Sequence, residues 1–140
     1  ITGWNVAKSA NKESALAGWS LTRKYFRRMK LPLSGVIVHS DQGKPFVSYL
    51  YVGKLLKNGI RLSYATRGAR DNPRMESGIG RFKEEYKEEL SQVQSFAELK
   101  SMLKSKVRDW NGSRIHSALK GRSPDEFIKN IVPFTYSLKS

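Results

Sequence analysis

The sequence predicts an α/β layer fold, in which helices alternate with short strands and pack against a sheet. Two segments show strand patterns: residues 36–38 are a continuous β-branched run, and residues 60–64 alternate apolar with polar side chains. The segments around them carry apolar side chains at helical spacing. With 140 residues, the chain is long enough for one domain with a hydrophobic core.

The first elements along the chain are expected to be a strand over residues 1–7 and a helix over about 12–29. The helix has Asn11 as its N-cap. Its apolar side chains at helical spacing are Leu16, Trp19, Phe26 and Met29. Because a domain seldom begins within a strand, we expect the natural protein to extend upstream of Ile1.

The next elements are the two strands and the helix between them. The run at 36–38 has the composition of a strand that is buried on both faces in a parallel sheet. A helix over about 46–57 is expected to end at 58–59 (Asn-Gly), a common C-terminal signal. The alternation at 60–64 indicates a half-exposed strand.

Three further helices follow a loop at 66–71 that is rich in Arg and Gly. The first begins at 72–73, with Asn as N-cap and Pro in the first helical position, and extends to about residue 90. Its predicted core stripe is Met75, Ile79, Phe82, Tyr86 and Leu90. The second opens with a capping box at 95–98, and a last short helix opens with another at 123–126.

The charge balance favours a polyanionic partner. The chain has 26 Lys and Arg against 12 Asp and Glu, a net charge of +14, and such an excess causes self-repulsion. The alternative is simply a soluble basic surface. The lack of cysteine excludes disulfides, a thiolate nucleophile and Cys-rich zinc sites. No apolar run approaches the roughly 20 residues of a membrane span and no signal peptide is visible, so we expect a cytoplasmic protein.

Asp41 is the first candidate for a catalytic carboxylate. It lies in the segment 39–43 (HSDQG), directly after the apolar run at 36–38. In open α/β sheets, reactive groups gather at the carboxyl ends of the strands. The alternative is an Asx-turn residue ahead of Gly43, a common structural role for Asp. Position alone does not separate these two interpretations.

Glu76 is the second candidate carboxylate, near the start of the helix that begins at Asn72. A capping-box glutamate stands three residues after the cap, and Glu76 fits neither a cap at Asn72 nor one at Asp71. A glutamate that complements the helix dipole remains an alternative. Arginines and glycines surround Glu76, and this setting suits metal binding beside phosphate.

Carboxylates are the side chains that metal-dependent phosphodiester chemistry requires. Two Mg²⁺ or Mn²⁺ ions roughly 3.5–4 Å apart stabilise the attacking and leaving oxygens, and hard carboxylate oxygens hold the ions. Asp41 and Glu76 are far apart in the sequence, so this chemistry requires them to meet at one edge of the sheet.

Five stretches in order resemble the integrase-core transposases of bacterial insertion sequences, which are related to retroviral integrases. They are 39–43 (HSDQG), 58–63 (NGIRLS), 67–68 (RG) with 71–77 (DNPRMES), 110–119 (WNGSRIHSAL) and 123–127 (SPDEF). Their order and spacing hold over about 35–128, and the first predicted strand and helix fit more loosely.

The resemblance implies a ribonuclease-H-like mixed sheet with flanking helices, in which an Asp, Asp, Glu triad holds two Mg²⁺ or Mn²⁺ ions. Asp41 corresponds to the second member and Glu76 to the third, with 34 residues between them, one fewer than is typical of the family. The resemblance also implies DNA as the partner, both element ends and target, and a homo-oligomer associated with the bacterial nucleoid.

The same resemblance implies that the first Asp and the first two strands are missing upstream of Ile1. Residues 1–110 then correspond to a truncated integrase-like catalytic core, and 111–140 to a C-terminal extension of the core with a short helix. We expect this chain alone to bind metal poorly and to be nearly inactive. Its open sheet edges favour dimerisation. Residues 78–79 (Gly-Ile) stand where relatives carry two aromatics, a departure that affects the packing of the helix.

Several basic residues are candidates for DNA contact, because guanidinium groups match the geometry of phosphate. The candidates are Arg67, Arg70, Arg74, Arg81, Lys83, Arg114 and His116. A solvated surface charge is the alternative for each of the basic side chains, and packing of a turn is the alternative for His116. A second row is formed by Lys100, Lys104 and Arg108, and for this row a solvated helix face is favoured.

A non-catalytic basic DNA-binding or assembly module, such as a decayed transposase, is the alternative to a metal-dependent polynucleotidyl transferase. An unrelated RNA-binding protein would explain the charge but not the ordered stretches. The sequence contains no Gly-rich phosphate loop of the nucleotide-binding type, so no nucleotide cofactor is indicated.

Overall fold

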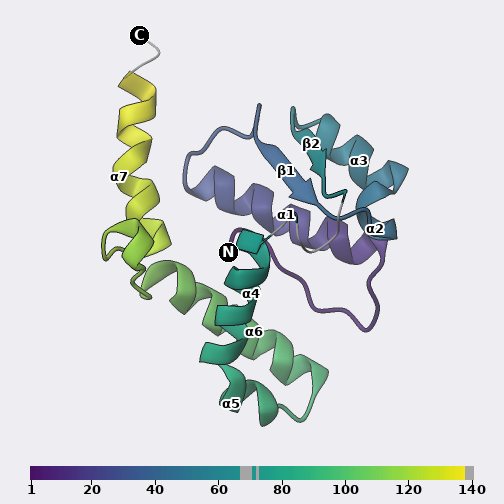
Figure 1. The fold of residues 1–140 in the computed structure, drawn as a ribbon, viewed down its shortest axis with the longest axis vertical. Helices are drawn as coiled ribbons and strands as arrows, with labels where there is room; N and C mark the ends of the chain where they lie inside the picture. The colour runs from purple at the N-terminus through teal and green to yellow at the C-terminus, as the bar shows by residue number, and fades with distance from the viewer. Residues whose placement is uncertain (67–70, 72, 138–140) are drawn as a thin grey trace.

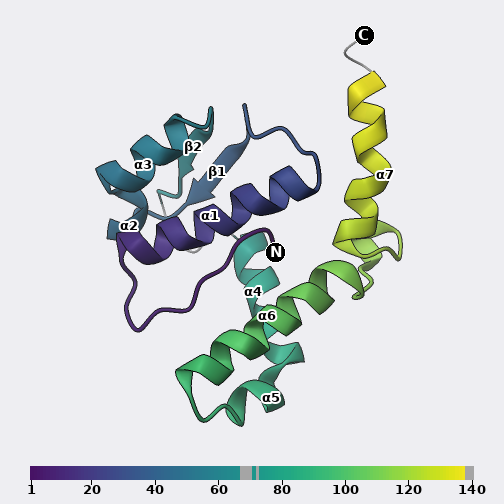
Figure 2. The ribbon, with the colours of Figure 1, turned by 180° about the vertical axis from the view of Figure 1, so that it is seen from behind.

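The computed structural model describes residues 1–66, 71 and 73–137 and has the predicted α/β class. Its helices and strands are, in chain order, α1 (Lys12–Arg28), β1 (Ile37–Ser40), α2 (Lys44–Val47), α3 (Tyr49–Leu56), β2 (Arg61–Tyr64), α4 (Pro73–Glu85), α5 (Lys87–Ser91), α6 (Phe96–Gly112) and α7 (Pro124–Ser137). Helix α1 crosses one face of the two strands, α4 to α6 form a second group, and α7 projects away from both (Figures 1 and 2).

The strand predicted over residues 1–7 is wrong, because this segment has no regular secondary structure. It runs so close to α1 that a Cβ atom on Gly3 would lie 2.2 Å from the carbonyl oxygen of Gly18. At its start, the buried Asn111 side chain donates a hydrogen bond to the carbonyl oxygen of Ile1 at 2.7 Å. This segment is therefore held by contacts with α1 and α6 and not by pairing with a neighbouring strand.

Helix α1 follows the prediction closely. The Asn11 side chain accepts a hydrogen bond from the backbone N–H of Ser14 at 2.8 Å, so Asn11 is the N-cap. The helix ends before Lys30, whose φ of 54° is in the left-handed region and cannot continue a helix. Trp19 and Tyr25 are its buried side chains.

The sheet consists of β1 and β2, which pair in parallel with Val38 opposite Leu62. These two side chains pack against a core cluster formed by Trp19 of α1 and three further buried residues, Tyr51, Leu55 and Ile60. The prediction that the strand at residues 36–38 is buried on both faces is wrong, because Ile37 is 56% exposed. The helices cover one face of this strand and leave the other open.

The helix predicted over about 46–57 is divided into α2 and α3 at Ser48. This residue has an extended backbone, with φ −65° and ψ 139°, and its hydroxyl accepts a hydrogen bond from the N–H of Tyr51. A serine that caps α3 in this way ends the shorter α2 before it. The predicted C-terminal signal is confirmed, since Gly59 has a positive φ of 71°.

A second core cluster joins α4, α6 and Tyr86, the residue between α4 and α5. It consists of Phe82, Tyr86, Val107 and Trp110, with Trp4 packed against it. The predicted core stripe of the helix after 73 is wrong in its first half, because Met75 is 58% and Ile79 is 46% exposed. Only the second half of α4 packs against α6, and the backbone of Tyr86 (φ −113°, ψ 20°) interrupts the predicted long helix.

Both predicted capping boxes are confirmed in their main feature. Ser95 accepts a hydrogen bond from the N–H of Glu98 at the start of α6. At the start of α7, the Ser123 N–H donates to Glu126 Oε2 at 2.9 Å, and the Ser123 side chain is fully buried. Helix α7 has 14 residues and is longer than the short helix expected there. None of the helices within 1–66 and 73–137 is long and apolar enough to cross a membrane.

Candidate functional site

Asp41 lies directly after β1, at the carboxyl end of a parallel strand, as predicted. Its side chain is exposed, and Oδ1 accepts a hydrogen bond from the Gly43 N–H at 3.0 Å. This is the Asx turn of the structural alternative. The turn uses one carboxylate oxygen, and Oδ2 makes no hydrogen bond within the described part of the chain. The carboxylate is therefore oriented by the turn and still offers an oxygen to solvent.

Gly43 keeps the space in front of this carboxylate open. A Cβ atom at residue 43 would lie 2.9 Å from Asp41 Oδ1, closer than real Cβ contacts allow. A side chain at this position would therefore move the Asp41 carboxylate away from its present direction. The close approach concerns only the end of the Asp41 side chain, and the φ of Gly43, −56°, suits any residue.

Glu76 lies in the first turn of α4 and is exposed. It forms no ion pair within the described residues. A negative side chain at a helix N-terminus is favourable for the helix dipole, so a structural role and a role as a ligand both fit this position. Within residues 1–66, 71 and 73–137, no group of three or more His, Asp or Glu side chains is arranged to hold a metal ion.

Some of the predicted DNA-contact residues line one cavity of about 430 Å³ beside the start of α4. Arg74 and Arg81 line it from one face of α4, and His116 lines it from the turn after α6. Lys83 is exposed on α4 but does not line this cavity. The predicted contacts Arg67 and Arg70, and the predicted N-cap Asn72, lie outside the described residues.

Trp110 also lines this cavity. Its side chain is buried in the second core cluster. Its ring also contacts the His116 ring edge-on, with centroids 5.2 Å apart. Helical spacing predicts that such a residue is buried, but it does not predict a cavity beside it.

Arg114 is held by neighbours within the protein. Its Nε donates to Glu85 Oε2 at 2.5 Å, and its guanidinium lies 4.3 Å from the centre of the Trp110 ring. Its Nη1 lies 3.1 Å from His116 Nδ1. Burial and the nearby Arg114 charge lower the pKa of His116, so the neutral ring accepts this hydrogen bond. Arg114 therefore fixes the turn that carries His116, and its contact with phosphate stays a prediction.

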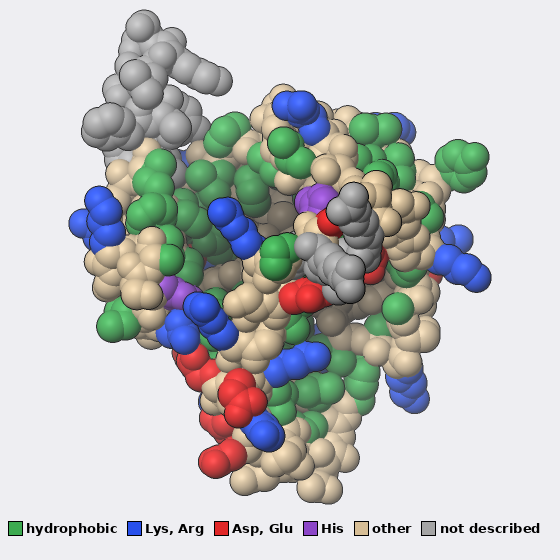
Figure 3. All heavy atoms as spheres, viewed as in Figure 1, with side chains coloured by type: hydrophobic (Ala, Val, Ile, Leu, Met, Phe, Trp, Pro, Cys, Tyr) green, Lys and Arg blue, Asp and Glu red, His purple; other side chains and the backbone are tan. Residues whose placement is uncertain are grey.

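The surface charge is unevenly distributed. On the face shown in Figure 3, acidic side chains gather at the bottom of the view, over the end of α4 and α5. This region contains Glu84, Glu85, Glu88 and Glu89. Three of these form ion pairs: Glu84 with Lys87, Glu85 with Arg114 and Glu89 with Lys106. The basic excess is consequently concentrated away from α5, on the remaining surface.

Comparisons with known proteins agree with the resemblance found in the sequence. Residues 58–124 match the family model of the integrase core domain. An uncharacterized transposase-like protein of Haemophilus influenzae is 31% identical over 128 residues, which cover 89% of this chain and 55% of that protein. The transposase for insertion sequence element IS904 of Lactococcus lactis is 27% identical over 126 residues, covering 81% and 50%. The chain spans about half the length of these relatives. It belongs to the integrase-core family of insertion-sequence transposases.

Proposed function

We propose that this chain is part of the catalytic core of a DNA transposase that cleaves DNA ends and joins them to a target. Besides the family, one observation carries the proposal: Asp41 lies exposed at the carboxyl end of β1, with Oδ2 directed to solvent from a fixed turn. The parallel pair β1 and β2 with α1 across one face supports a ribonuclease-H-like sheet as the complete architecture.

The donor atoms at Asp41 and Glu76 fit a divalent metal. Both side chains are exposed carboxylates, which supply the hard oxygen ligands that Mg²⁺ and Mn²⁺ prefer. When bound, such ions stabilise charge on the attacking and leaving oxygens of a phosphodiester. The Gly43 N–H orients the Asp41 carboxylate before the metal binds, so little side-chain freedom is lost on binding.

DNA is the proposed partner, and the cavity beside α4 supplies contacts to it. Arg74 and Arg81 line this cavity from α4, the helix that also carries Glu76, although Glu76 itself does not line it. Lys83 and the predicted contacts Arg67 and Arg70 extend the same basic segment of the sequence. We also propose a homo-oligomer, because the short sheet has open edges. A monomer in light scattering at high protein concentration would contradict that part.

The test is a strand-transfer assay with the protein of native length. Labelled duplex DNA from the flanks of its own reading frame is incubated with Mn²⁺, and EDTA serves as the control. We expect joined products with Mn²⁺ and none with EDTA. The 140-residue chain, run in parallel, is expected to bind Mn²⁺ weakly and to give little product, since its described residues contain no group of three ligands. Efficient metal-dependent joining by this chain would refute that expectation.

The second candidate function is a non-catalytic DNA-binding or assembly module. The net charge of +14 and the lack of a three-ligand group in the described residues favour it. The two functions separate in the same experiment. One outcome is DNA binding that weakens steeply with salt, without metal-dependent joining by the native-length protein. It would assign the function to the basic surface and leave Asp41 and Glu76 without a catalytic role.

A further inference from the structure

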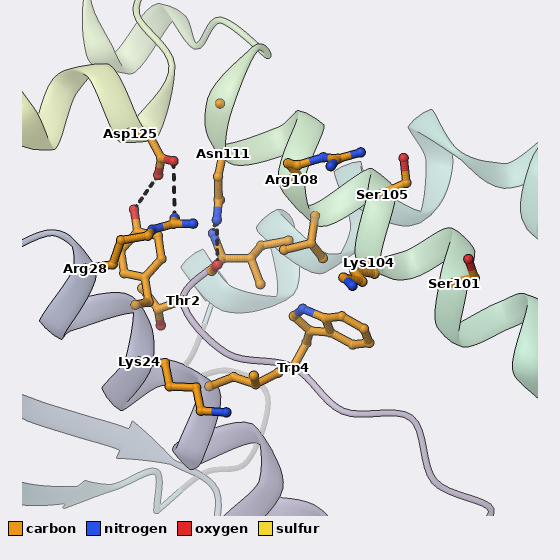
Figure 4. A pocket seen from close by; sticks show the side chains of 15 residues that line it. Thr2, Trp4, Lys24, Arg28, Ser101, Lys104, Ser105, Arg108, Asn111 and Asp125 are labelled. Atoms are coloured by element: carbon orange, nitrogen blue, oxygen red, sulfur yellow. Dashed lines mark hydrogen bonds and ion pairs between the residues drawn. The ribbon is translucent and has the colours of Figure 1, made fainter.

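A cleft of about 540 Å³ lies between α1 and α6, and the N-terminal segment runs through it (Figure 4). Its volume is within the range of about 300–1,000 Å³ that is typical of ligand sites. It is separate from the cavity beside α4, because the two have no lining residue in common. The sequence predicts a strand for the N-terminal segment and favours a solvated face for Lys104 and Arg108.

The walls of the cleft carry three cations that have no partner among the described residues. Lys24 extends from α1, while Lys104 and Arg108 stand one turn apart on α6. All three are exposed, and none forms an ion pair or hydrogen bond within the described residues. Cations on both facing walls repel one another across the gap. An anion placed between them would relieve this repulsion.

The one carboxylate that lines the cleft is already occupied. Asp125 accepts a hydrogen bond from the Tyr25 hydroxyl at 2.7 Å and forms an ion pair with Arg28 at 3.4 Å. Figure 4 shows this group at one end of the cleft, away from Lys104. Asp125 therefore does not neutralise Lys24, Lys104 or Arg108, and the middle of the cleft stays positive.

The remaining lining suits a nucleotide chain rather than a single small anion. The half-buried Trp4 indole packs in part against the second core cluster, and the rest of its ring surface lines the cleft below Lys104 in Figure 4. The hydroxyls of Ser101 and Ser105 line the same wall as Lys104. A positively charged groove with an aromatic side chain in it is the arrangement that binds single-stranded nucleic acid, with phosphates on the cations and bases on the ring.

We propose that the cleft between α1 and α6 binds single-stranded DNA. Lys24 on one wall and Lys104 with Arg108 on the other would hold successive phosphates, and Trp4 would contact a base. This inference depends on the proposed function only in taking DNA as the nucleic acid. It requires no metal and neither of the two candidate catalytic carboxylates.

The test compares two variants that each lose three positive charges. The cleft variant carries Lys24→Gln, Lys104→Gln and Arg108→Gln. The control variant carries Lys44→Gln, Lys54→Gln and Lys57→Gln, exposed residues of α2, α3 and the C-cap of α3. Binding of a fluorescent oligo(dT) of about 12 nucleotides is followed by anisotropy in EDTA over a range of salt concentrations.

We expect the cleft variant to bind at least about tenfold more weakly at 0.1 M salt, with a log–log salt slope smaller by about 2, the value for three lost single-strand contacts. The control variant should stay within about threefold of the unmodified chain. Equal losses in both variants, or none in the cleft variant, would overturn the proposal. A loss confined to duplex DNA would overturn the choice of a single strand.

Trp4 supplies a local signal for the same event. Titration with oligo(dT) should change the tryptophan fluorescence of the unmodified chain, and Trp4→Phe should remove most of the change. An undiminished change in Trp4→Phe would place the bound strand elsewhere, for instance at Trp110. Because these measurements are made in EDTA, failure of the strand-transfer assay leaves their outcome unaffected, and the two proposals fail separately.

Discussion

Asp41→Asn in the native-length protein is expected to lower Mn²⁺-dependent strand transfer by about a thousandfold, with DNA binding unchanged. Asparagine keeps a side-chain oxygen that can accept from the Gly43 N–H, so the turn after β1 should persist. What is lost is the negative charge that favours a divalent cation. Transition-state stabilisation by bound metal is worth several kcal/mol, and each ~1.4 kcal/mol corresponds to about tenfold in rate.

Glu76→Gln tests the second carboxylate in the same way and should give a loss of similar size. Asp109→Asn and Glu13→Gln are the matched controls, since both remove an exposed carboxylate at a position with no proposed metal role. The strand-transfer rate is measured at saturating Mn²⁺, and DNA binding is measured separately. A rate for Asp41→Asn or Glu76→Gln within about threefold of the unmodified protein would remove that residue from the metal site.

Leu55→Ala is expected to destabilise the fold by about 2–5 kcal/mol, the usual cost of a cavity at a fully buried leucine. Leu55 has 0% exposure and lies in the core cluster with Trp19, Tyr51 and Ile60. Small domains have a total stability of about 5–15 kcal/mol, so this loss is a large part of the whole. The free energy of unfolding is measured by circular dichroism in urea.

The neighbouring Leu56 provides the control for this substitution. It lies on the same helix, is of the same residue type, and is 56% exposed. Leu56→Ala should change the free energy of unfolding by no more than about 0.5 kcal/mol, as is usual for surface positions. Equal effects of the two substitutions would show that the cluster around Leu55 does not form the main core in solution.

Features that depend on nearby residues were predictable from the sequence. Asn11 as the N-cap of α1, the glycine at 59 and the capping box at Ser123 are each formed by residues within four positions of one another. Their chemistry is local, so the same side chains form the same hydrogen bonds wherever the helix is placed. The position of Asp41 was predicted for a related reason, because a strand end is visible in the sequence.

Features that depend on distant partners were not predictable. Ile37 has the composition of a buried strand residue, but no helix covers its face of the sheet. Met75 follows the helical stripe of α4, yet α6 contacts only the later turns of that helix. Arg114 stands in a family-like stretch, and its partner Glu85 is 29 residues away. Composition predicts a face that suits burial, but not whether another element reaches it.

The candidate sites also combine local features, which the sequence predicts, with features that depend on distant residues. The basic row on α6 is visible in the sequence. The opposite wall of the cleft is formed by α1 with Lys24, which is 80 or more positions away from Lys104 and Arg108 in the sequence. No periodic pattern within one helix contains that information. The sequence therefore favours a solvated face for this row of α6, whereas in the fold α1 lies across the cleft from it.

The hydrogen bond from Tyr25 to Asp125 joins two parts of the chain that are 100 residues apart. Burial and this hydrogen bond raise the pKa of the Tyr25 hydroxyl. Asp125 lies in the first turn of α7, and its other tether, Arg28, also lines the cleft. An anion that draws Arg28 away from Asp125 would leave the Tyr25 hydroxyl as the remaining α1 group bonded to Asp125 among the described residues. Binding of that anion and the Arg28–Asp125 ion pair would then be thermodynamically linked, and each would weaken the other by the same free energy.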